Sequence, residues 1–195
     1  MFIEPKNGKG WIEVVCGSMF SGKTEELIRR IKRAKIANLN VRIFKPKMET
    51  RYDKVKVVSH DDNYVDSFPV ESAKEILDWC DDVDVVGIDE AQFFDKDLPY
   101  VCNVLANRNK RVIVAGLDMD YMAAPFGKMP DLMAMAEYVT KVHAICMQCG
   151  SVAQYSYRFS KSGNQVLLGE KDQYEPRCRI CYVKGMAEQN LEIDI

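Results

Sequence analysis

The sequence predicts an α/β fold: a mostly parallel sheet flanked by helices, followed by a small C-terminal domain built around cysteines. Three observations predict it. Short apolar runs alternate with longer amphipathic stretches, a glycine-rich loop follows the first run, and four cysteines form two C-x-x-C pairs in the last quarter. Strand–helix alternation is typical of parallel sheets, whose strands are joined by right-handed helical crossovers.

Five short apolar runs are predicted to be the strands of this sheet. Several of them are nearly continuous in valine and isoleucine, as expected for strands that are covered on both faces. The runs are Trp11–Cys16, Val41–Phe44, Val83–Ile88, Arg111–Leu117 and Tyr138–Cys146.

Three stretches between these runs are predicted to be helices. The first spans about Thr24–Ala37, where apolar residues recur at helical spacing. The second spans Ser72–Cys80, with Ser72 as the N-cap and Glu75 completing a capping box, and the third spans Leu98–Asn109. The first helix carries a basic run that we interpret as a solvated face, with a subunit contact as the alternative. That run is Arg29, Arg30, Lys32, Arg33 and Lys35.

The character of the sequence changes after His143, which predicts one domain over residues 1–143 and a second over residues 144–195. The second segment has turn signals and both cysteine pairs, but no strongly periodic helix. Its six basic and six acidic residues cancel, so it has no net positive charge to attract a nucleic-acid backbone.

The composition is that of an ordinary globular protein, with 195 residues, 47% hydrophobic residues and a net charge of -2. The N-terminus lacks the apolar core of a signal peptide, and no apolar run approaches the ~20 residues that span a bilayer. These features predict a cytoplasmic protein without a membrane or nucleic-acid partner. Because cytoplasmic thiols stay reduced, its seven cysteines are not expected to form a disulfide framework.

The glycine-rich loop is the strongest functional signal. It fits G-x-x-x-x-G-K-[ST], a P-loop, and lies between a predicted strand and a predicted helix, as that motif requires. The glycines let backbone N–H groups point at phosphate oxygens, and the helix N-terminus adds partial positive charge. We expect the lysine to reach the β- and γ-phosphates and the threonine hydroxyl to bind Mg²⁺. The loop is Gly17, Ser18, Met19, Phe20, Ser21, Gly22, Lys23 and Thr24.

The third apolar run ends in two acidic residues, Asp89 and Glu90. P-loop proteins place a carboxylate at such a strand end to hold the metal, so Asp89 is predicted to act with Thr24 at Mg²⁺. Glu90 is then predicted to be a general base. An ATPase that activates water and a kinase that activates a substrate hydroxyl use the same residues. This pair therefore leaves the phosphate acceptor open.

The two C-x-x-C pairs, Cys146 with Cys149 and Cys178 with Cys181, indicate a metal site. Two such pairs supply four thiolates for tetrahedral Zn²⁺ and leave no open coordination position, so we predict a structural zinc. The alternative, a redox C-x-x-C, is normally part of a thioredoxin-like unit, of which the sequence shows no sign.

In their order, the motifs resemble those of one family, the zinc-containing thymidine kinases related to the human cytosolic enzyme. The resemblance covers roughly residues 10–184. No single short motif is decisive, but this order on so short a chain is highly specific. The motifs are GSMFSGKT (17–24), ETRY (49–52), SHD (59–61), DEAQFF (89–94), GLD (116–118), PFG (125–127), CMQC (146–149) and PRCRICY (176–182).

The resemblance implies a P-loop NTPase-type α/β domain, a small zinc-ribbon-like domain and, between the cysteine pairs, a lasso loop that closes over the nucleoside. It implies transfer of the γ-phosphate of ATP to the 5′-hydroxyl of thymidine in nucleotide salvage, with Glu90 as the catalytic base. It also implies a homotetramer and feedback inhibition by thymidine triphosphate.

Further site residues are implied by the resemblance alone. At the ATP phosphates the P-loop is joined by Glu49, Asp89, Glu90, Ala91 and Gln92. The residues expected around the nucleoside are Met19, Arg51, Phe93, Leu117, Tyr121, Phe126, Ser156, Arg158 and Tyr174, and the backbone of Gln165, Val166, Leu167, Leu168 and Gly169. Glu49 stands where many relatives have aspartate and Tyr121 where some have phenylalanine, and both differences keep the chemistry.

Two other interpretations remain open from the residues alone. One is a P-loop ATPase whose zinc module binds nucleic acid, which the neutral C-terminal segment disfavours. The other is a nucleotide-binding switch without enzymatic activity, which has no need for Glu90 beside Asp89.

Overall fold

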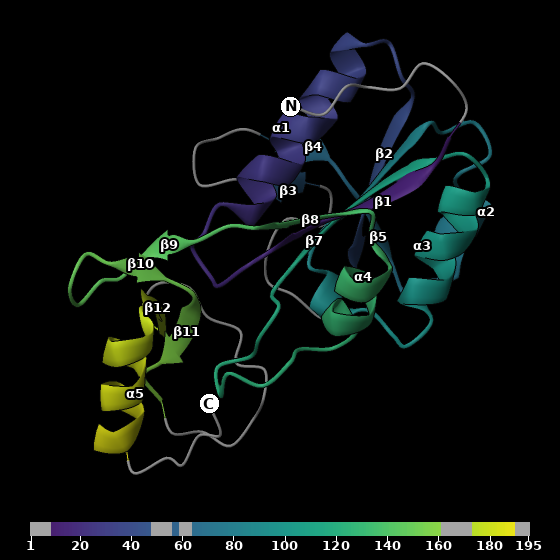
Figure 1. Cartoon of the computed structure of the whole chain (residues 1–195). Coiled ribbons are helices and arrows are strands. Elements are labelled where there is room, and N and C mark those ends of the chain that lie inside the picture. The colour runs from purple at the N-terminus through teal and green to yellow at the C-terminus, as the bar shows by residue number, and fades with distance from the viewer. Residues whose placement is uncertain (1–8, 48–55, 59–63, 161–172, 190–195) are drawn as a thin grey trace.

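The computed structural model describes residues 9–47, 56–58, 64–160 and 173–189. At its centre lies a six-stranded sheet in the order β5–β2–β6–β7–β1–β8, and all its neighbouring strands run parallel (Figure 1). This sheet confirms the predicted α/β fold. Its strands are β1 (Trp11–Cys16), β2 (Val41–Pro46), β5 (Phe68–Val70), β6 (Val85–Ile88), β7 (Arg111–Gly116) and β8 (Tyr138–Lys141).

Helices cover both faces of the sheet (Figure 1). On one face, Leu27 and Ile31 of the first helix pack against strand residues such as Ile43 and Ile113. The helices α2, α3 and α4 bury their apolar side chains in a larger cluster on the opposite face. Double coverage explains why the strands read as continuous apolar runs. Among the described residues, no helix is both long and apolar enough to cross a membrane. The helices are α1 (Lys23–Ile36), α2 (Glu75–Asp78), α3 (Leu98–Asn107) and α4 (Met129–Met135).

The C-terminal part is built from two small antiparallel sheets, β9–β10 and β11–β12, and the helix α5. Tyr182 and Met186 of α5 pack with Tyr155 and Tyr157 of β11 in a separate buried cluster. A third antiparallel pair, β3–β4, comes between β2 and β5 in the chain. The bounds are β3 (Lys56–Val58), β4 (Tyr64–Asp66), β9 (Ala144–Ile145), β10 (Val152–Ala153), β11 (Tyr155–Arg158), β12 (Tyr174–Arg177) and α5 (Arg179–Glu188).

The run Tyr138–Cys146, predicted to be one strand, forms two. β8 pairs with β1 in the central sheet, whereas β9 pairs with β10 in a small one. The Val142 N–H still donates to the Cys16 carbonyl at 2.8 Å, after which the chain leaves the central sheet. The run mixes apolar residues with Thr140, Lys141 and His143, and nothing in this pattern marks the change of sheet.

The absence of a strong helix from the C-terminal segment was also a wrong prediction, because α5 spans ten residues. Its buried side contains Tyr182, Gly185 and Met186, and a glycine and a tyrosine give a weak apolar signal. A side chain at Gly185 would collide with the Arg177 guanidinium and approach the Tyr157 ring at 2.7 Å. Gly185 thus weakens the helical pattern in the sequence, and it also lets α5 pack closely against Arg177 and Tyr157.

The second predicted helix is shorter than expected, because α2 begins only at Glu75. Half of the expected capping box forms: the Ser72 N–H donates to Glu75 Oε1 at 3.1 Å. Ser72 Oγ donates to the same carboxylate instead of capping a backbone N–H. The Ala73 N–H donates to Asp95 Oδ2 at 2.9 Å, and this bond holds Ser72 and Ala73 outside the helix.

One residue of the basic run on α1 is not solvated. Arg30 is 3% exposed and donates to Glu13 Oε2 at 2.7 Å, and Glu13 on β1 is itself fully buried. Glu13 Oε1 also accepts from Arg111 Nε of β7 and from Trp11 Nε1, each at 2.7 Å. The prediction of a solvated face is wrong for Arg30, because a buried carboxylate on the strand beneath offers it a partner.

Candidate active site

The predicted phosphate and base residues meet at one edge of the sheet. β1 leads into Gly17, β6 ends just before Asp89, and β7, which lies between those two strands, ends just before Leu117. In register, Cys16 at the end of β1 lies beside Gly116 at the end of β7. Ligands of open α/β sheets bind at such carboxyl ends.

The P-loop conformation depends on its glycines. Gly17 has a φ of 146° and Gly22 a φ of 83°, in a region that L side chains rarely adopt. A Cβ on Gly17 would also collide with the Val142 carbonyl. α1 begins at Lys23, directly after Gly22, so its unpaired N-terminal N–H groups open onto the loop. The segment therefore has the backbone of an anion-binding loop.

Lys23 brings the positive charge of the loop. Its ammonium donates to the Ser18 carbonyl at 2.7 Å, inside the loop. Burial lowers the pKa of Lys23, and the nearby carboxylates of Glu90, Asp89 and Asp118 oppose this shift. A phosphate group would add further negative charge beside the ammonium and favour its protonated form.

Thr24 and Asp89 are adjacent, as a shared metal role requires. Thr24 Oγ1 donates to Asp89 Oδ2 at 3.3 Å. Burial, and next the charge of Glu90, raise the pKa of Asp89 to about 7. A hydroxyl and a carboxylate are oxygen ligands suited to Mg²⁺, and a cation there would favour the ionised carboxylate. The donor set thus fits a Mg²⁺ ion that arrives with a nucleotide.

Glu90 is exposed and adopts a left-handed backbone conformation with a φ of 52°. Its carboxylate accepts a hydrogen bond from Gln92 Nε2 at 2.6 Å, and Gln92 Oε1 accepts one from the Leu117 N–H at 2.9 Å. Non-glycine residues held in this region are uncommon and often occur at functional sites. Glu90 thus lies at the carboxyl end of β6, where a ligand of such a sheet would bind.

Several residues predicted to line the nucleoside pocket contact one another. The Met19 N–H of the P-loop donates to Ser156 Oγ of β11 at 3.0 Å, which joins the phosphate loop to the C-terminal part. The rings of Phe93 and Phe126 meet edge-to-face with centroids 5.5 Å apart. Phe93 lies in a 3₁₀ turn, η1 (Ala91–Phe93), directly after Glu90.

The segment 117–127 links the sheet to the C-terminal part. The guanidinium of Arg158 lies over the Tyr121 ring, 3.4 Å from its centroid. The Tyr121 carbonyl accepts a hydrogen bond from the hydroxyl of Tyr182, a buried α5 residue, at 2.6 Å. Met119 and Met122 pack against the tyrosine cluster of α5 and β11. The structure thus places Tyr121 and Arg158 together.

The remaining predicted site residues divide into described and undescribed ones. The Ala91 side chain is buried in the core on one face of the sheet. Tyr174 is buried in β12, where it pairs in register with Arg158. The other predictions, including the main-chain thymine contacts within the predicted lasso loop, lie outside the described residues. They concern Glu49, Arg51, Gln165, Val166, Leu167, Leu168 and Gly169.

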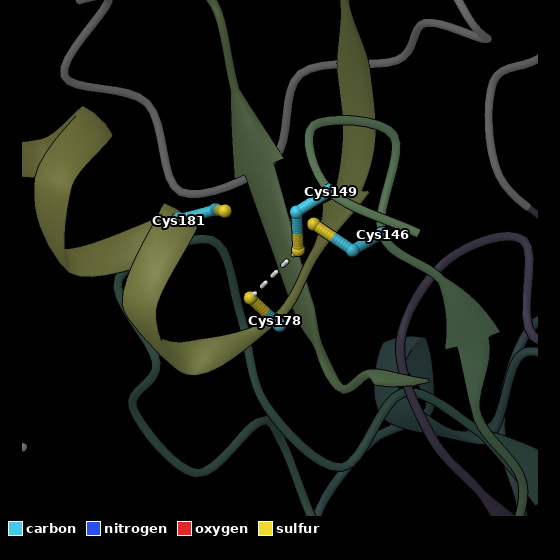
Figure 2. A group of neighbouring side chains, drawn as sticks. All are labelled: Cys146, Cys149, Cys178 and Cys181. Atoms are coloured by element: carbon cyan, nitrogen blue, oxygen red, sulfur yellow. Dashed lines mark hydrogen bonds between the residues drawn. The ribbon is translucent and has the colours of Figure 1, made fainter. Parts of the chain in front are cut away.

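The four cysteines of the C-x-x-C pairs converge on one point (Figure 2). Cys146 and Cys149 come from the turn after β9, and Cys178 and Cys181 from the start of α5. Their sulfur atoms all lie within 4.8 Å of one another, with 3.6 Å between Cys149 and Cys178. A disulfide needs about 2.05 Å, whereas sulfurs bound tetrahedrally at about 2.3 Å from Zn²⁺ lie somewhat under 4 Å apart. The cluster fits a tetrahedral metal site.

Sequence reasoning missed one buried carboxylate at the site edge. Asp118 lies two residues after the end of β7, and its Oδ2 pairs with Lys141 Nζ at 2.7 Å. Its Oδ1 is buried without a hydrogen-bond partner among the described residues. An acidic residue directly after the predicted apolar run Arg111–Leu117 was the signal that could have identified it.

Comparison with known proteins adds a family match. The family described as "Thymidine kinase" matches residues 10–182. A thymidine kinase of Bacteroides fragilis strain YCH46 is 58% identical over 186 residues, which cover 95% of this chain and 94% of the relative. One of Rhodothermus sp. strain ITI 518 is 61% identical over 173 residues, 89% of this chain and 81% of the relative. One of Bacteroides thetaiotaomicron strain ATCC 29148 is 56% identical over 191 residues, 98% and 96% of the two chains.

Proposed function

The chain belongs to the thymidine kinase family and so catalyses ATP-dependent phosphorylation of thymidine, and we propose that Glu90 is the general base of this reaction. The observation that supports the role of Glu90 is its position. It follows the buried Asp89 at the end of β6, and its charge acts on both Lys23 and Asp89. A base at this point can meet a substrate hydroxyl brought up to the phosphate loop.

The reaction step follows from that position. Glu90 takes the proton of the 5′-hydroxyl, and the hydroxyl oxygen attacks the γ-phosphorus of ATP. The bond from that phosphorus to the bridging oxygen breaks, and ADP leaves with the electron pair. The charge on the equatorial oxygens is stabilised by the loop N–H groups and the Lys23 ammonium.

Thr24 and Asp89 are the residues that would hold Mg²⁺. Held there with ATP, the ion would supply positive charge that offsets the negative charge of the phosphates. The P-loop conformation, set by Gly17 and Gly22, orients the nucleotide for in-line transfer.

The acceptor side is proposed to be a pocket between the sheet edge and the C-terminal part. Phe93 and Phe126 supply aromatic surface from the sheet side, and Ser156 reaches the P-loop from β11. The family resemblance supports a lasso loop in the stretch between the cysteine pairs that closes this pocket, with backbone groups of 165–169 pairing with thymine. Exclusion of water by such a loop would favour transfer to the sugar over hydrolysis.

We propose that the metal of the cysteine cluster is Zn²⁺ and that its role is structural. Four thiolates saturate a tetrahedral ion, so no position is left for a substrate or water. The site holds the turn after β9 against the start of α5. The family resemblance further supports a homotetramer that thymidine triphosphate inhibits, and we propose both on that ground. A cytoplasmic location is proposed on the sequence features given above.

The test of the general base is Glu90→Gln, which keeps the shape of the side chain and removes its basicity. The rate of thymidine phosphorylation should fall by about 10²–10⁴-fold while ATP binding is retained. Glu71→Gln, at an exposed residue outside the site, is the matched control and should leave the rate unchanged. A near-normal rate in Glu90→Gln would exclude this residue as the base.

A further inference from the structure

Resting on the proposed role of Glu90, we propose that Gln92 is the positioning residue that orients the general base and ties it to the nucleoside pocket. Glu90 needs such support, because it is exposed and its backbone is held in the left-handed region at a φ of 52°. A flexible, solvated glutamate would sample many orientations, and most of them would not face a substrate hydroxyl.

Gln92 uses both ends of its amide for this task. It is only 3% exposed, its Nε2 donates to Glu90 Oε2 at 2.6 Å, and its Oε1 accepts from the Leu117 N–H at 2.9 Å. The first bond engages one carboxylate oxygen and leaves Oε1 of Glu90 to take the substrate proton. The second bond anchors the amide to the backbone just after β7. Through this bond the orientation of Glu90 is fixed relative to the central sheet.

Two glycines make room for this arrangement. A Cβ on Gly116 would lie 2.8 Å from Gln92 Oε1 and 2.7 Å from Met129 Sδ. A Cβ on Gly127, whose φ is 54°, would collide with the Gln92 carbonyl. Gly116 opens the GLD motif and Gly127 ends the PFG motif, next to Phe126 of the proposed pocket. The backbone on both sides of the pocket segment is thus shaped around Gln92.

A glutamine suits this position chemically. Its amide is neutral, so the donor and the acceptor stay in place at any working pH. A hydrogen bond to an ionised carboxylate is shorter and stronger than one between neutral groups. A buried glutamine with both hydrogen bonds made could instead serve the stability of the fold alone. The two roles predict different rates for the double variant of Gln92 and Glu90.

The test uses Gln92→Glu and Gln92→Met in single-turnover phosphorylation of thymidine at saturating ATP. Gln92→Glu still accepts from the Leu117 N–H but no longer donates to Glu90, and its charge repels the base. We expect its rate to fall by about 10- to 100-fold, the loss typical of a hydrogen bond to a charged group, with the thymidine KM within about threefold. Gln92→Met loses both bonds and should lower the rate and also raise the thymidine KM.

The decisive measurement is the double variant. If Gln92 acts through Glu90, adding Gln92→Met to Glu90→Gln should change the rate by less than about threefold. An equal loss in both backgrounds, or a Gln92→Glu rate within about threefold of the native protein, would overturn the inference. If Gln92→Glu fails to fold, as its melting curve would show, the Gln92→Met cycle decides the same question. A normal rate in Glu90→Gln alone would instead refute the proposed base.

A matched control removes a bond to a carboxylate elsewhere. Lys74 Nζ donates to Asp97 Oδ2 at 2.9 Å on the surface, away from the phosphate loop and the cysteine cluster. Lys74→Met should keep the native single-turnover rate, so a rate loss at Gln92 cannot be ascribed to loss of such a bond in general.

Discussion

The buried charge network around Glu13 allows a prediction whose size follows from the structure. Glu13 is fully buried and holds Arg30 and Arg111 at 2.7 Å each. Glu13→Gln keeps the volume but removes the negative charge, which leaves two buried guanidinium groups with less compensation. Arg30 keeps the Glu26 carboxylate at 2.8 Å, and the Arg111 guanidinium also lies over the Trp11 ring, 5.6 Å from its centroid.

Breaking a buried ion pair by removing one partner costs about 3–5 kcal/mol. For a chain of this length, each kcal/mol shifts the melting temperature by roughly 2–4 °C, so we expect Glu13→Gln to lower it by about 6–20 °C. Thermal unfolding followed by circular dichroism measures the shift. Glu71→Gln, which breaks the exposed pair with Lys47, is the control and should leave the melting temperature unchanged.

The network lies in β1 before the P-loop, so the variant should still phosphorylate thymidine at a temperature where it is folded. A shift below about 2 °C would refute the reasoning, because it would show that the arginines find water or other partners without cost. Loss of activity in the folded variant would show that the network shapes the loop as well.

Two further predictions concern the metal and acid stability. Removing the metal, or changing Cys178 to Ser, should raise the thymidine KM more than the ATP KM. The reason is that the cysteine cluster holds the part of the chain that carries Ser156. An unchanged thymidine KM in metal-free protein would contradict this prediction. Hydrogen bonds first from Arg29 and then from Arg30 lower the pKa of Glu26 to about 2 from 4.5. The stability that this pairing adds is present above about pH 4.5 and is lost as pH falls toward 2. In Glu26→Gln the melting temperature should therefore depend less on pH over that range than in the native protein. An unchanged pH dependence would contradict this prediction.

The sequence predicted those parts of the site whose chemistry depends on local spacing. The P-loop needs glycines at Gly17 and Gly22 for backbone reasons, and the metal cluster needs two C-x-x-C pairs, so both patterns are visible in the chain itself. The doubly covered strands were visible for the same reason, because burial on both faces leaves a continuous apolar run.

Features that depend on contacts between distant segments could not be predicted. Arg30 looked solvated because its charged neighbours on α1 are, and only the strand beneath shows that Glu13 receives it. The two amide bonds of Gln92, to Glu90 and to the Leu117 backbone 25 residues away in the chain, likewise leave no signal in the sequence. α5 was missed because its packing relies on Gly185, which weakens the helical signal.

The central claim is that Glu90 serves a thymidine 5′-hydroxyl rather than water. The most direct measurement is a phosphate-transfer assay with ATP, Mg²⁺ and thymidine, deoxyuridine, deoxycytidine, deoxyadenosine and deoxyguanosine in parallel, with ADP release recorded in each. We predict that thymidine monophosphate forms in step with ADP, that Glu90→Gln slows the formation of both by about 10²–10⁴-fold, and that deoxycytidine and the purine nucleosides stay unphosphorylated. ADP release without any phosphorylated nucleoside would contradict the account, because Glu90 would then be activating water.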